Sequence, residues 1–169
     1  MDRLVDCSEL LPRYAEWCER VQRMHPAFGE AGDDGGRPAW TNAIRAPSES
    51  RVMLVSSAGV HGRSDPPFDL KNGCGDESIR RIRGDTTVGE LVASHAHYDT
   101  EAANEDINVV FPLDALRSLR DAGSVGAVSD VHLGFMGFVP DPGTLRLLVD
   151  HVVSEVLEAA PDIVVLSPG

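Results

Sequence analysis

The chain has 169 residues, 42% hydrophobic and 25% charged, which is the composition of one globular domain rather than of a disordered segment. Its formal net charge of −12 argues against nucleic acid as a partner, because an acidic surface repels phosphates. No apolar run approaches the ~20 residues that span a bilayer. The three cysteines form no CxxC pair, so we expect a cytoplasmic protein without disulfides and without a membrane partner.

The first 50 residues are predicted to form an N-terminal helix and a Gly/Pro-rich connection that pack on the rest of the domain. Residues 8–23 carry apolar side chains at near-helical spacing behind Ser8, a residue suited to an N-cap. Residues 26–50 are rich in Gly, Pro, Asp and Ser, which favours a long irregular connection. Residues 51–169 have the alternating strand and helix patterns of an α/β domain, and we expect one structural domain overall.

The first half of this α/β part alternates between apolar and irregular segments. RVMLVSSAGV, residues 51–60, predicts a buried strand that enters a turn of small residues. Residues 61–78 are too rich in Gly and Pro for regular structure. VGELVASHA, residues 88–96, predicts a second strand, and residues 113–123 predict a short amphipathic helix that ends at a glycine.

The second half repeats the alternation. Residues 124–139 predict a third strand or a hairpin, and residues 162–169 a fourth strand. Residues 141–160 predict the strongest helix, because Asp141 can cap it and Pro142 suits its first position. Strands that alternate with helices indicate an α/β fold with a single open, largely parallel sheet flanked by helices.

Histidines gather where the predicted strands end. Ligands of open α/β sheets bind at the carboxyl ends of the strands, so the residues that follow each strand should converge. His61 follows the first strand, and His95 and His97 follow the second, together with Asp99. With His132 in the third element, four of the six histidines are predicted at one edge of the sheet.

Several chemistries could use such an edge. His and Asp side chains there could act as general acids and bases, because His titrates near neutral pH. His95, His97 and Asp99 could instead bind a metal ion, since side chains two apart share one face of a strand. The histidines could also serve structure alone, by satisfying buried backbone groups. The dinucleotide-binding, P-loop and Gly-x-Ser-x-Gly patterns are absent.

Four segments, in order, are similar to one known family. These segments are RVMLVSSAGVHGRSDPPFDL, CGDESIRRIRGD, LVASHAHYDTEAANEDINVVFPLDALRSL and VGAVSDVHLGFMG. Over residues 38–169 the chain resembles the selenoprotein B subunit family of the glycine, betaine, sarcosine and D-proline reductases. It departs from the family pattern at Ala58, where glycine is usual, and at Gly84, where proline is usual, and Cys74 is not a family position.

The resemblance implies a reductase that cleaves a small amine or amino-acid-like substrate with a selenol or thiol nucleophile. In the family, the strand that corresponds to residues 162–169 is followed directly by selenocysteine or cysteine. We therefore expect the nucleophile immediately after Gly169, and a chain that is cut at a selenocysteine codon, which is otherwise read as stop. A thiol reductant or redox protein and a homo-oligomer are further expectations. The resemblance leaves open whether a partner subunit carries a pyruvoyl group, and it implies no cofactor in this chain.

The resemblance also implies roles for particular residues. The catalytic candidates are His61, His95, His97 and Asp99, and no metal is expected in this reading. The substrate-binding candidates are Gly59, Asp76, Ser78, Arg80, Asp106, Asn108 and His132. Arg80 could equally be an internal salt-bridge partner of Asp76. Two alternatives remain at this point: a non-catalytic binding or assembly module, and a metal-dependent hydrolase that uses His95, His97 and Asp99.

Overall fold

Residues 44–169 are the part of the chain that the computed structural model describes. The helix predicted for residues 8–23 and most of the predicted connection, residues 26–50, lie outside the described residues. One short turn of 3-10 helix, η3 (Pro47–Glu49), leads directly into the first strand.

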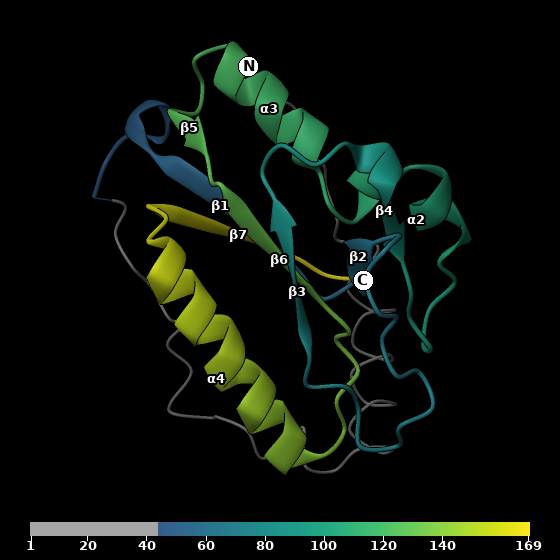
Figure 1. The fold of residues 1–169 in the computed structure, drawn as a ribbon. Coiled ribbons are helices and arrows are strands. Elements are labelled where there is room, and N and C mark those ends of the chain that lie inside the picture. The colour runs from purple at the N-terminus through teal and green to yellow at the C-terminus, as the bar shows by residue number, and fades with distance from the viewer. Residues whose placement is uncertain (1–43) are drawn as a thin grey trace, which may run out of the picture. The chain divides into compact units, whose positions relative to one another are not determined.

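The sheet is built around a buried central strand, β1 (Arg51–Ser56), as Figure 1 shows. On one side β1 pairs with β5 (Ala127–Val128) and β6 (Val131–Phe135), and on the other with β7 (Ile163–Ser167), all in parallel. β3 (Ile79–Arg83) pairs antiparallel with β6. This confirms the predicted α/β fold with a largely parallel sheet, because adjacent parallel strands here are linked by helical crossovers.

One face of the sheet is covered by α4 (Pro142–Ala159). The Asp141 side chain accepts a hydrogen bond of 2.8 Å from the Thr144 N–H and caps the helix, and Pro142 occupies its first turn. Leu148 is buried, and Val152 packs against the strand residues of this face. The helix predicted for residues 141–160 is therefore confirmed, with its apolar stripe on the sheet.

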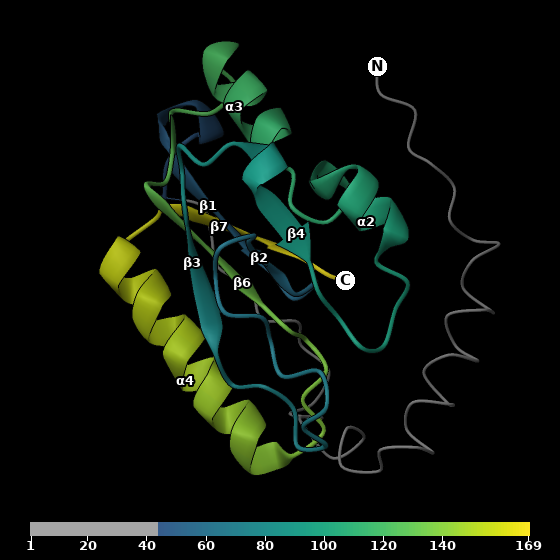
Figure 2. The ribbon, with the colours of Figure 1, turned by 45° about the vertical axis from the view of Figure 1, so that its right-hand side comes forward.

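The other face carries several short elements, which Figures 1 and 2 show on the side of the sheet away from α4. Phe111 is fully buried here against the core that the sheet contributes. The elements are α2 (Glu101–Glu105), η5 (Ile107–Val109), α3 (Leu113–Asp121), β2 (Val60–Gly62), η4 (Val88–Glu90) and β4 (Leu91–Ala93). The helix predicted for residues 113–123 is confirmed as α3, and it ends before Gly123, which has a φ of 72°.

The strand predicted for residues 88–96 is wrong in extent and in place. Only residues 91–93 are extended, as β4, and they pair antiparallel with β2 in a separate two-stranded sheet. Residues 88–90 form η4 instead, because Thr87 and Glu90 make a reciprocal capping box at its start.

Among the strands and α-helices, β3 and α2 were not predicted. β3 has the sequence IRRIR, in which only Ile82 is buried, so its apolar pattern is weak. It is held by pairing with β6 and by an ion pair of 2.7 Å between Arg81 and Glu155 of α4. The short helix α2 lies in a segment whose sequence is mostly polar.

The remaining strand predictions hold with adjusted limits. The strand predicted for residues 51–60 is divided between β1 and β2. Of residues 61–78, which were predicted to be irregular, residues 61–62 belong to β2 and residues 63–78 are irregular. The third element is two short strands that both run parallel to β1, not a hairpin. Within residues 44–169, no helix combines the length and the apolar character that crossing a bilayer would require.

Candidate functional site at the carboxyl edge of the sheet

The carboxyl ends of β1, β6 and β7 are joined by backbone hydrogen bonds. Ser57, directly after β1, donates its N–H to the Ser167 carbonyl at 3.0 Å and accepts from the Gly137 N–H at 2.8 Å. The Gly59 N–H donates to the Phe135 carbonyl at 2.8 Å. Segments far apart in the sequence thus meet at one edge, as the rule for open α/β sheets predicts.

Gly59 is required where the chain leaves β1 for β2. Its φ is 71°, a conformation that side chains other than glycine rarely adopt, and a Cβ atom there would lie 2.0 Å from the Ser94 carbonyl oxygen. The Ser94 N–H also donates to the Gly59 carbonyl at 2.9 Å. The close approach brings the segment of residues 94–98 against the end of β1.

His61 and Ser94 form a hydrogen-bonded pair at this contact. The Nδ1 atom of His61 lies 2.8 Å from the Gly62 carbonyl oxygen, which can only accept, so Nδ1 carries the proton. The Nε2 atom lies within hydrogen-bond distance of the Ser94 hydroxyl, at 2.9 Å. His61 is 5% exposed, whereas Ser94 is half-buried.

Four rings contact one another around residues 95–98. The His95 ring lies with its centroid 4.8 Å from that of Tyr98 and 6.1 Å from that of His97, and the His97 ring lies 3.5 Å from that of Phe138. Burial, and then the charge of His97, lower the pKa of His95 below its usual value. Burial raises the pKa of Tyr98, so its hydroxyl remains a proton donor at neutral pH.

Gly169 lies against the same group of residues. The Tyr98 hydroxyl donates a hydrogen bond of 2.8 Å to the Ala58 carbonyl. A Cβ atom built on Gly169 would be 2.7 Å from the Ala58 Cα and 2.9 Å from the Tyr98 Cε1. We call residues 57–59, 94–98, 137–138 and 167–169 the carboxyl-edge cluster.

Asp99 adjoins the cluster but has a local role. It is exposed, and its carboxylate accepts a hydrogen bond of 2.9 Å from the Glu101 N–H, which begins α2. Within residues 44–169, no three His, Cys, Asp or Glu side chains are gathered so that they could hold a metal ion. The described geometry therefore gives no support to a metal-dependent hydrolase built on His95, His97 and Asp99.

His132 does not join the other three histidines. It lies near the start of β6 rather than at its carboxyl end and is 0% exposed. Its Nδ1 atom accepts a hydrogen bond of 2.9 Å from the Leu54 N–H, and its ring packs edge-on against Phe111. Burial, and then the charge of Arg117, lower its pKa to about 4, so the ring is neutral at pH 7. The role in substrate binding assigned to His132 remains a prediction, and such contact would require the core to open.

A hydrogen-bond network, made by Asp76, Ser78 and Arg80, stabilises the irregular segment before β3. The Asp76 carboxylate accepts from the Asp69 N–H and the Ser78 N–H, both at 2.7 Å, and from the Ser78 hydroxyl. Burial alone would raise the pKa of Asp76, but these hydrogen bonds and the charge of Arg80 outweigh it and lower the pKa.

Arg80, on β3, is the third member of this hydrogen-bond network. Its guanidinium donates to the Ser78 hydroxyl at 2.8 Å and to the Pro66 carbonyl at 2.9 Å, and it lies over the Phe68 ring at 4.3 Å from the centroid. Arg80 and Asp76 are thus bridged by Ser78. These contacts fit an internal, structural use, and the proposed contact with substrate is left as a prediction.

Asp106 and Asn108 also make local contacts. The Asp106 carboxylate caps η5 by accepting from the Asn108 N–H at 3.0 Å, and the Asn108 side chain accepts from the Asp114 N–H at 3.1 Å. Asn104, which was not singled out in the sequence, makes two hydrogen bonds to the backbone of Ala93, of 2.8 and 3.0 Å. Asn104 thus ties α2 to β4 beside the cluster.

Phe138 belongs to the cluster but is not among the candidate residues predicted from the sequence. The signal was available, because the FMGFV run lies at the carboxyl end of the predicted third element, where the carboxyl-end rule applies. The run was interpreted as part of the strand itself, which hid its position at the edge.

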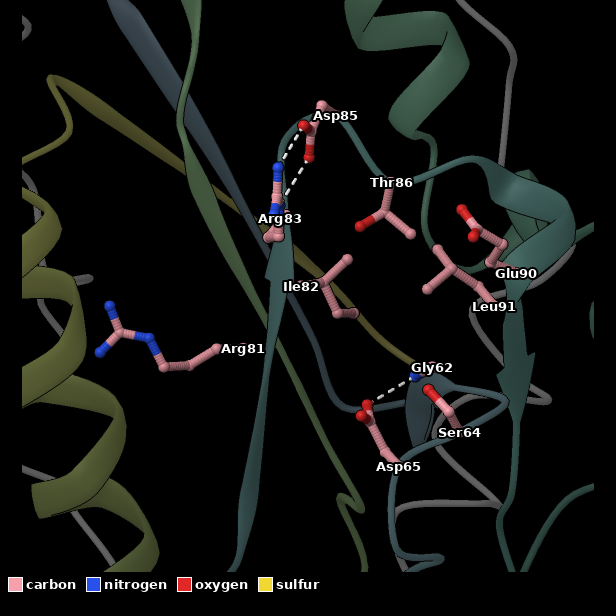
Figure 3. Close-up of a pocket in the computed structure, with 10 residues that line it drawn as sticks. All are labelled: Gly62, Ser64, Asp65, Arg81, Ile82, Arg83, Asp85, Thr86, Glu90 and Leu91. Atoms are coloured by element: carbon pink, nitrogen blue, oxygen red, sulfur yellow. Dashed lines mark hydrogen bonds and ion pairs between the residues drawn. The ribbon is translucent and has the colours of Figure 1, made fainter.

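A separate open hollow of about 430 Å³ lies beside the end of β3, and Figure 3 shows its lining. Arg83 is paired there with Asp85 at 2.5 Å, and Asp65 accepts from the Gly62 N–H at 2.8 Å. Arg81 points away from it toward α4, where Glu155 binds it. None of the candidate residues from the sequence lines this hollow, so the carboxyl-edge cluster is kept as the candidate site.

Replacement of Tyr98 by phenylalanine tests how firmly the cluster is held together. The change leaves the buried Ala58 carbonyl without its donor, and we expect the free energy of unfolding to fall by about 1 kcal/mol. Urea denaturation followed by circular dichroism measures the change. A Tyr98→Phe protein as stable as the wild type would show that water replaces the hydroxyl and that Tyr98 does not fasten the segment.

The chain is similar to proteins that are named as components of reductases. The chain is 40% identical to the D-proline reductase subunit gamma of Acetoanaerobium sticklandii over 100 residues, which cover 59% of this chain and 40% of that protein. It is 29% identical to the glycine reductase complex component B subunit gamma of Carboxydothermus hydrogenoformans over 98 residues, 56% of this chain and 22% of that protein. It is 22% identical over 127 residues to the sarcosine reductase complex component B subunit beta of Peptoclostridium acidaminophilum, 74% of this chain and 29% of that protein.

The matched segment is less than half the length of each of these relatives. No solved structure matches the chain significantly. The family model of glycine/sarcosine/betaine reductase selenoprotein B matches residues 38–168, which is most of the 169 residues. The chain therefore belongs to the glycine/sarcosine/betaine reductase selenoprotein B family.

Proposed function

We propose that this chain forms part of a selenol- or thiol-dependent reductase that cleaves a small amine or amino-acid-like substrate, and that the reaction takes place at the carboxyl-edge cluster. The observation that carries the proposal is the position of Gly169, in contact with Ala58 and Tyr98 where the two histidine-bearing segments meet. A nucleophile that follows Gly169 in the polypeptide would begin at this cluster.

The names of the relatives support the reaction class. They are components of D-proline, glycine and sarcosine reductases, and all are much longer than the segment they share with this chain. Because the shared segment is partial, the substrate and the partners of the whole protein are part of the proposal. We propose a cytoplasmic complex that takes electrons from thiols, with a pyruvoyl-bearing partner subunit as one arrangement that the family allows.

The chemistry requires a nucleophile and two electrons. A selenolate or thiolate supplies the nucleophile: its bond to the substrate carbon forms as the carbon–nitrogen bond breaks and the amine leaves with a proton. A thiol then attacks the selenium or sulfur, the carbon takes up a proton, and a second thiol completes a disulfide. The substrate gains two electrons and the two thiols lose them.

The cluster offers groups suited to the proton transfers. The lowered pKa of His95 keeps its ring neutral at pH 7, so the ring can accept a proton. The centroid of the His95 ring lies 4.8 Å from that of Tyr98, whose hydroxyl keeps its proton at this pH. We propose that His95 and His97 exchange protons with the substrate nitrogen and the nucleophile, and that the His61–Ser94 pair holds their segment in place.

The first test is the intact mass and the selenium content of the protein isolated from its native host. A product heavier than 18.2 kDa that carries selenium, and that cleaves an amine substrate with a dithiol as reductant, is the expected result. A native product of 18.2 kDa without selenium would remove the selenol mechanism for this chain.

A variant pair then tests the cluster in the native full-length protein. We expect His95→Asn to lower kcat at least about tenfold, which is a modest loss for a general acid or base. His151→Asn is the matched control, because His151 is exposed on α4, and it should leave kcat unchanged. Equal activity of the two variants would place the proton transfers on other groups.

A further inference from the structure

The central strand β1 ends on a buried polar residue. Ser56, the last residue of β1, is 0% exposed, and the four buried strand residues before it are the apolar run of residues 52–55. A buried hydroxyl destabilises a fold unless it is hydrogen-bonded. The partners of the Ser56 hydroxyl therefore show what a polar residue contributes at this position.

The Ser56 hydroxyl connects two segments of the chain. It donates a hydrogen bond of 2.9 Å to the carbonyl of Val110, the residue that ends η5. It also accepts a hydrogen bond of 3.2 Å from the Ala58 N–H, two residues further along the chain. One oxygen atom thus satisfies a buried carbonyl and a buried N–H, and it ties the turn after β1 to the short elements on that face of the sheet.

Ala58, which this hydroxyl holds, is a centre of the carboxyl-edge cluster. It is 0% exposed, and its carbonyl accepts the hydrogen bond of 2.8 Å from Tyr98. It also forms a β-bridge with Met136 and is in contact with Gly169. The N–H of Ala58 is therefore fixed by Ser56, and its carbonyl is fixed by the segment that carries the two histidines.

The packing around Ser56 leaves little room for a substitute. Gly134 of β6 lies beside it in the sheet, and a Cβ atom at Gly134 would lie 1.9 Å from the Val60 carbonyl oxygen. The backbone of β2 thus lies directly against the sheet at this level. Because Ser56 is also fully buried, loss of its hydroxyl would leave both partners unpaired at a place that bulk water does not reach.

We propose that Ser56 is a positioning residue for the reaction, and that its hydroxyl holds the Ala58 peptide on which the carboxyl-edge cluster is assembled. The inference rests on the proposed function, because it concerns the same cluster. Ser56 acts only through Ala58 and has no contact with the reacting atoms in this proposal. The reaction requires the nucleophile and His95 in a fixed relation, and a displacement of about 1 Å in such a site can lower the rate about a hundredfold.

Ser56→Ala and Ser50→Ala form a matched pair for the test, made in the native full-length protein. Ser50 directly precedes β1 at its other end, is 1% exposed and donates a hydrogen bond of 2.9 Å to the Ala46 carbonyl. The two variants therefore make the same change at opposite ends of one strand. Turnover is measured with D-proline, glycine and sarcosine, with dithiothreitol as the reductant.

We expect Ser56→Ala to lower kcat at least about tenfold and to change KM less than about twofold, because the lost contact orders the reacting groups and not the bound substrate. Ser50→Ala should keep the wild-type kcat. Equal values of kcat in the two variants would overturn the proposal.

Ser56→Thr is the rescue variant, because threonine keeps the hydroxyl. It should retain kcat within about threefold of the wild-type value. A folded Ser56→Thr protein that loses as much kcat as Ser56→Ala would show that packing, and not the hydroxyl, is required, which contradicts the proposal. If Ser56→Ala does not fold, as circular dichroism reports, the threonine variant decides by itself, and loss of kcat in its folded form overturns the proposal.

Hydrogen–deuterium exchange of the same proteins, followed by mass spectrometry, gives a readout that does not depend on turnover. Ser56→Ala should speed the exchange of residues 57–59 at least about tenfold, because the Ala58 N–H loses its acceptor, and Ser50→Ala should leave this exchange unchanged. Unchanged exchange in Ser56→Ala would also overturn the proposal. A wild-type protein that cleaves none of the three amines would count against the proposed function, and the exchange would still decide whether Ser56 holds the Ala58 peptide.

Discussion

Replacement of Gly59 by alanine is expected to lower the free energy of unfolding by about 2–5 kcal/mol, the sum of backbone strain and a steric clash. The φ of 71° disfavours any residue with a Cβ, and the added carbon would lie 2.0 Å from the Ser94 carbonyl oxygen, a backbone atom that cannot rotate away. The segment that carries His95 would have to shift for the alanine to fit. Urea denaturation followed by circular dichroism measures the loss.

The matched control for Gly59→Ala is Gly73→Ala. Nothing lies within 4 Å of a Cβ atom at Gly73, and its φ is not in the left-handed region, so the change should alter stability by less than about 0.5 kcal/mol. If Gly59→Ala were as stable as Gly73→Ala, the approach of residues 94–98 to the end of β1 would be looser than the structure has it.

Acidic pH should lower the free energy of unfolding, because His132 then takes up a proton in the unfolded chain. The folded-state pKa is about 4 and the ordinary value is 6.5, so between these pH values the unfolded chain binds a proton that the folded chain rejects. The contribution of the neutral ring to stability is complete above pH 6.5 and is lost as the pH falls toward 4. At 1.36 kcal/mol per pKa unit, the loss is of the order of 3 kcal/mol.

The hydrogen bonds of His132 also predict that acidic pH destabilises the folded protein. Protonation of Nδ1 would break its hydrogen bond of 2.9 Å from the Leu54 N–H and bring two donors face to face. The Nε2 atom has no hydrogen-bond partner among the described residues, so a positive ring would remain without an acceptor. A charged His132 is therefore incompatible with the folded core.

The pH dependence of urea denaturation tests this for two variants. His132→Asn keeps an acceptor near the Nδ1 position and cannot titrate, so its stability should lose most of the slope between pH 6.5 and 4, although the smaller side chain lowers stability at every pH. His151→Asn removes an imidazole that is exposed in the folded protein and should keep the wild-type slope. An unchanged slope in His132→Asn would show that other groups cause the acid sensitivity.

The candidate site was predicted in part. The carboxyl-end rule assigned the segments after β1 and around His95 to one edge, and the structure brings these two together with Gly169. The rule failed for His132, because the sequence does not show where within residues 124–139 the strand begins. If the strand ended near residue 132 instead of beginning there, His132 would lie at the edge of the sheet and not in the core.

The amino-acid sequence by itself determined the elements whose signals are local. The cap at Asp141, the proline that follows it and the apolar spacing predict α4, and the apolar runs predict β1 and β7. The ordered family motifs likewise required no structure. These signals depend on residues within a few positions of one another, so they are readable along the chain.

Only the tertiary structure decided features that depend on distant residues. β3 is a strand because β6 and α4 bind it, although three of its five residues are arginines. β4 leaves the main sheet because β2 pairs with it instead. His132 is neutral because Leu54 and the surrounding core exclude water from it. In each case the deciding free energy comes from a contact between segments far apart in sequence, which no local pattern encodes.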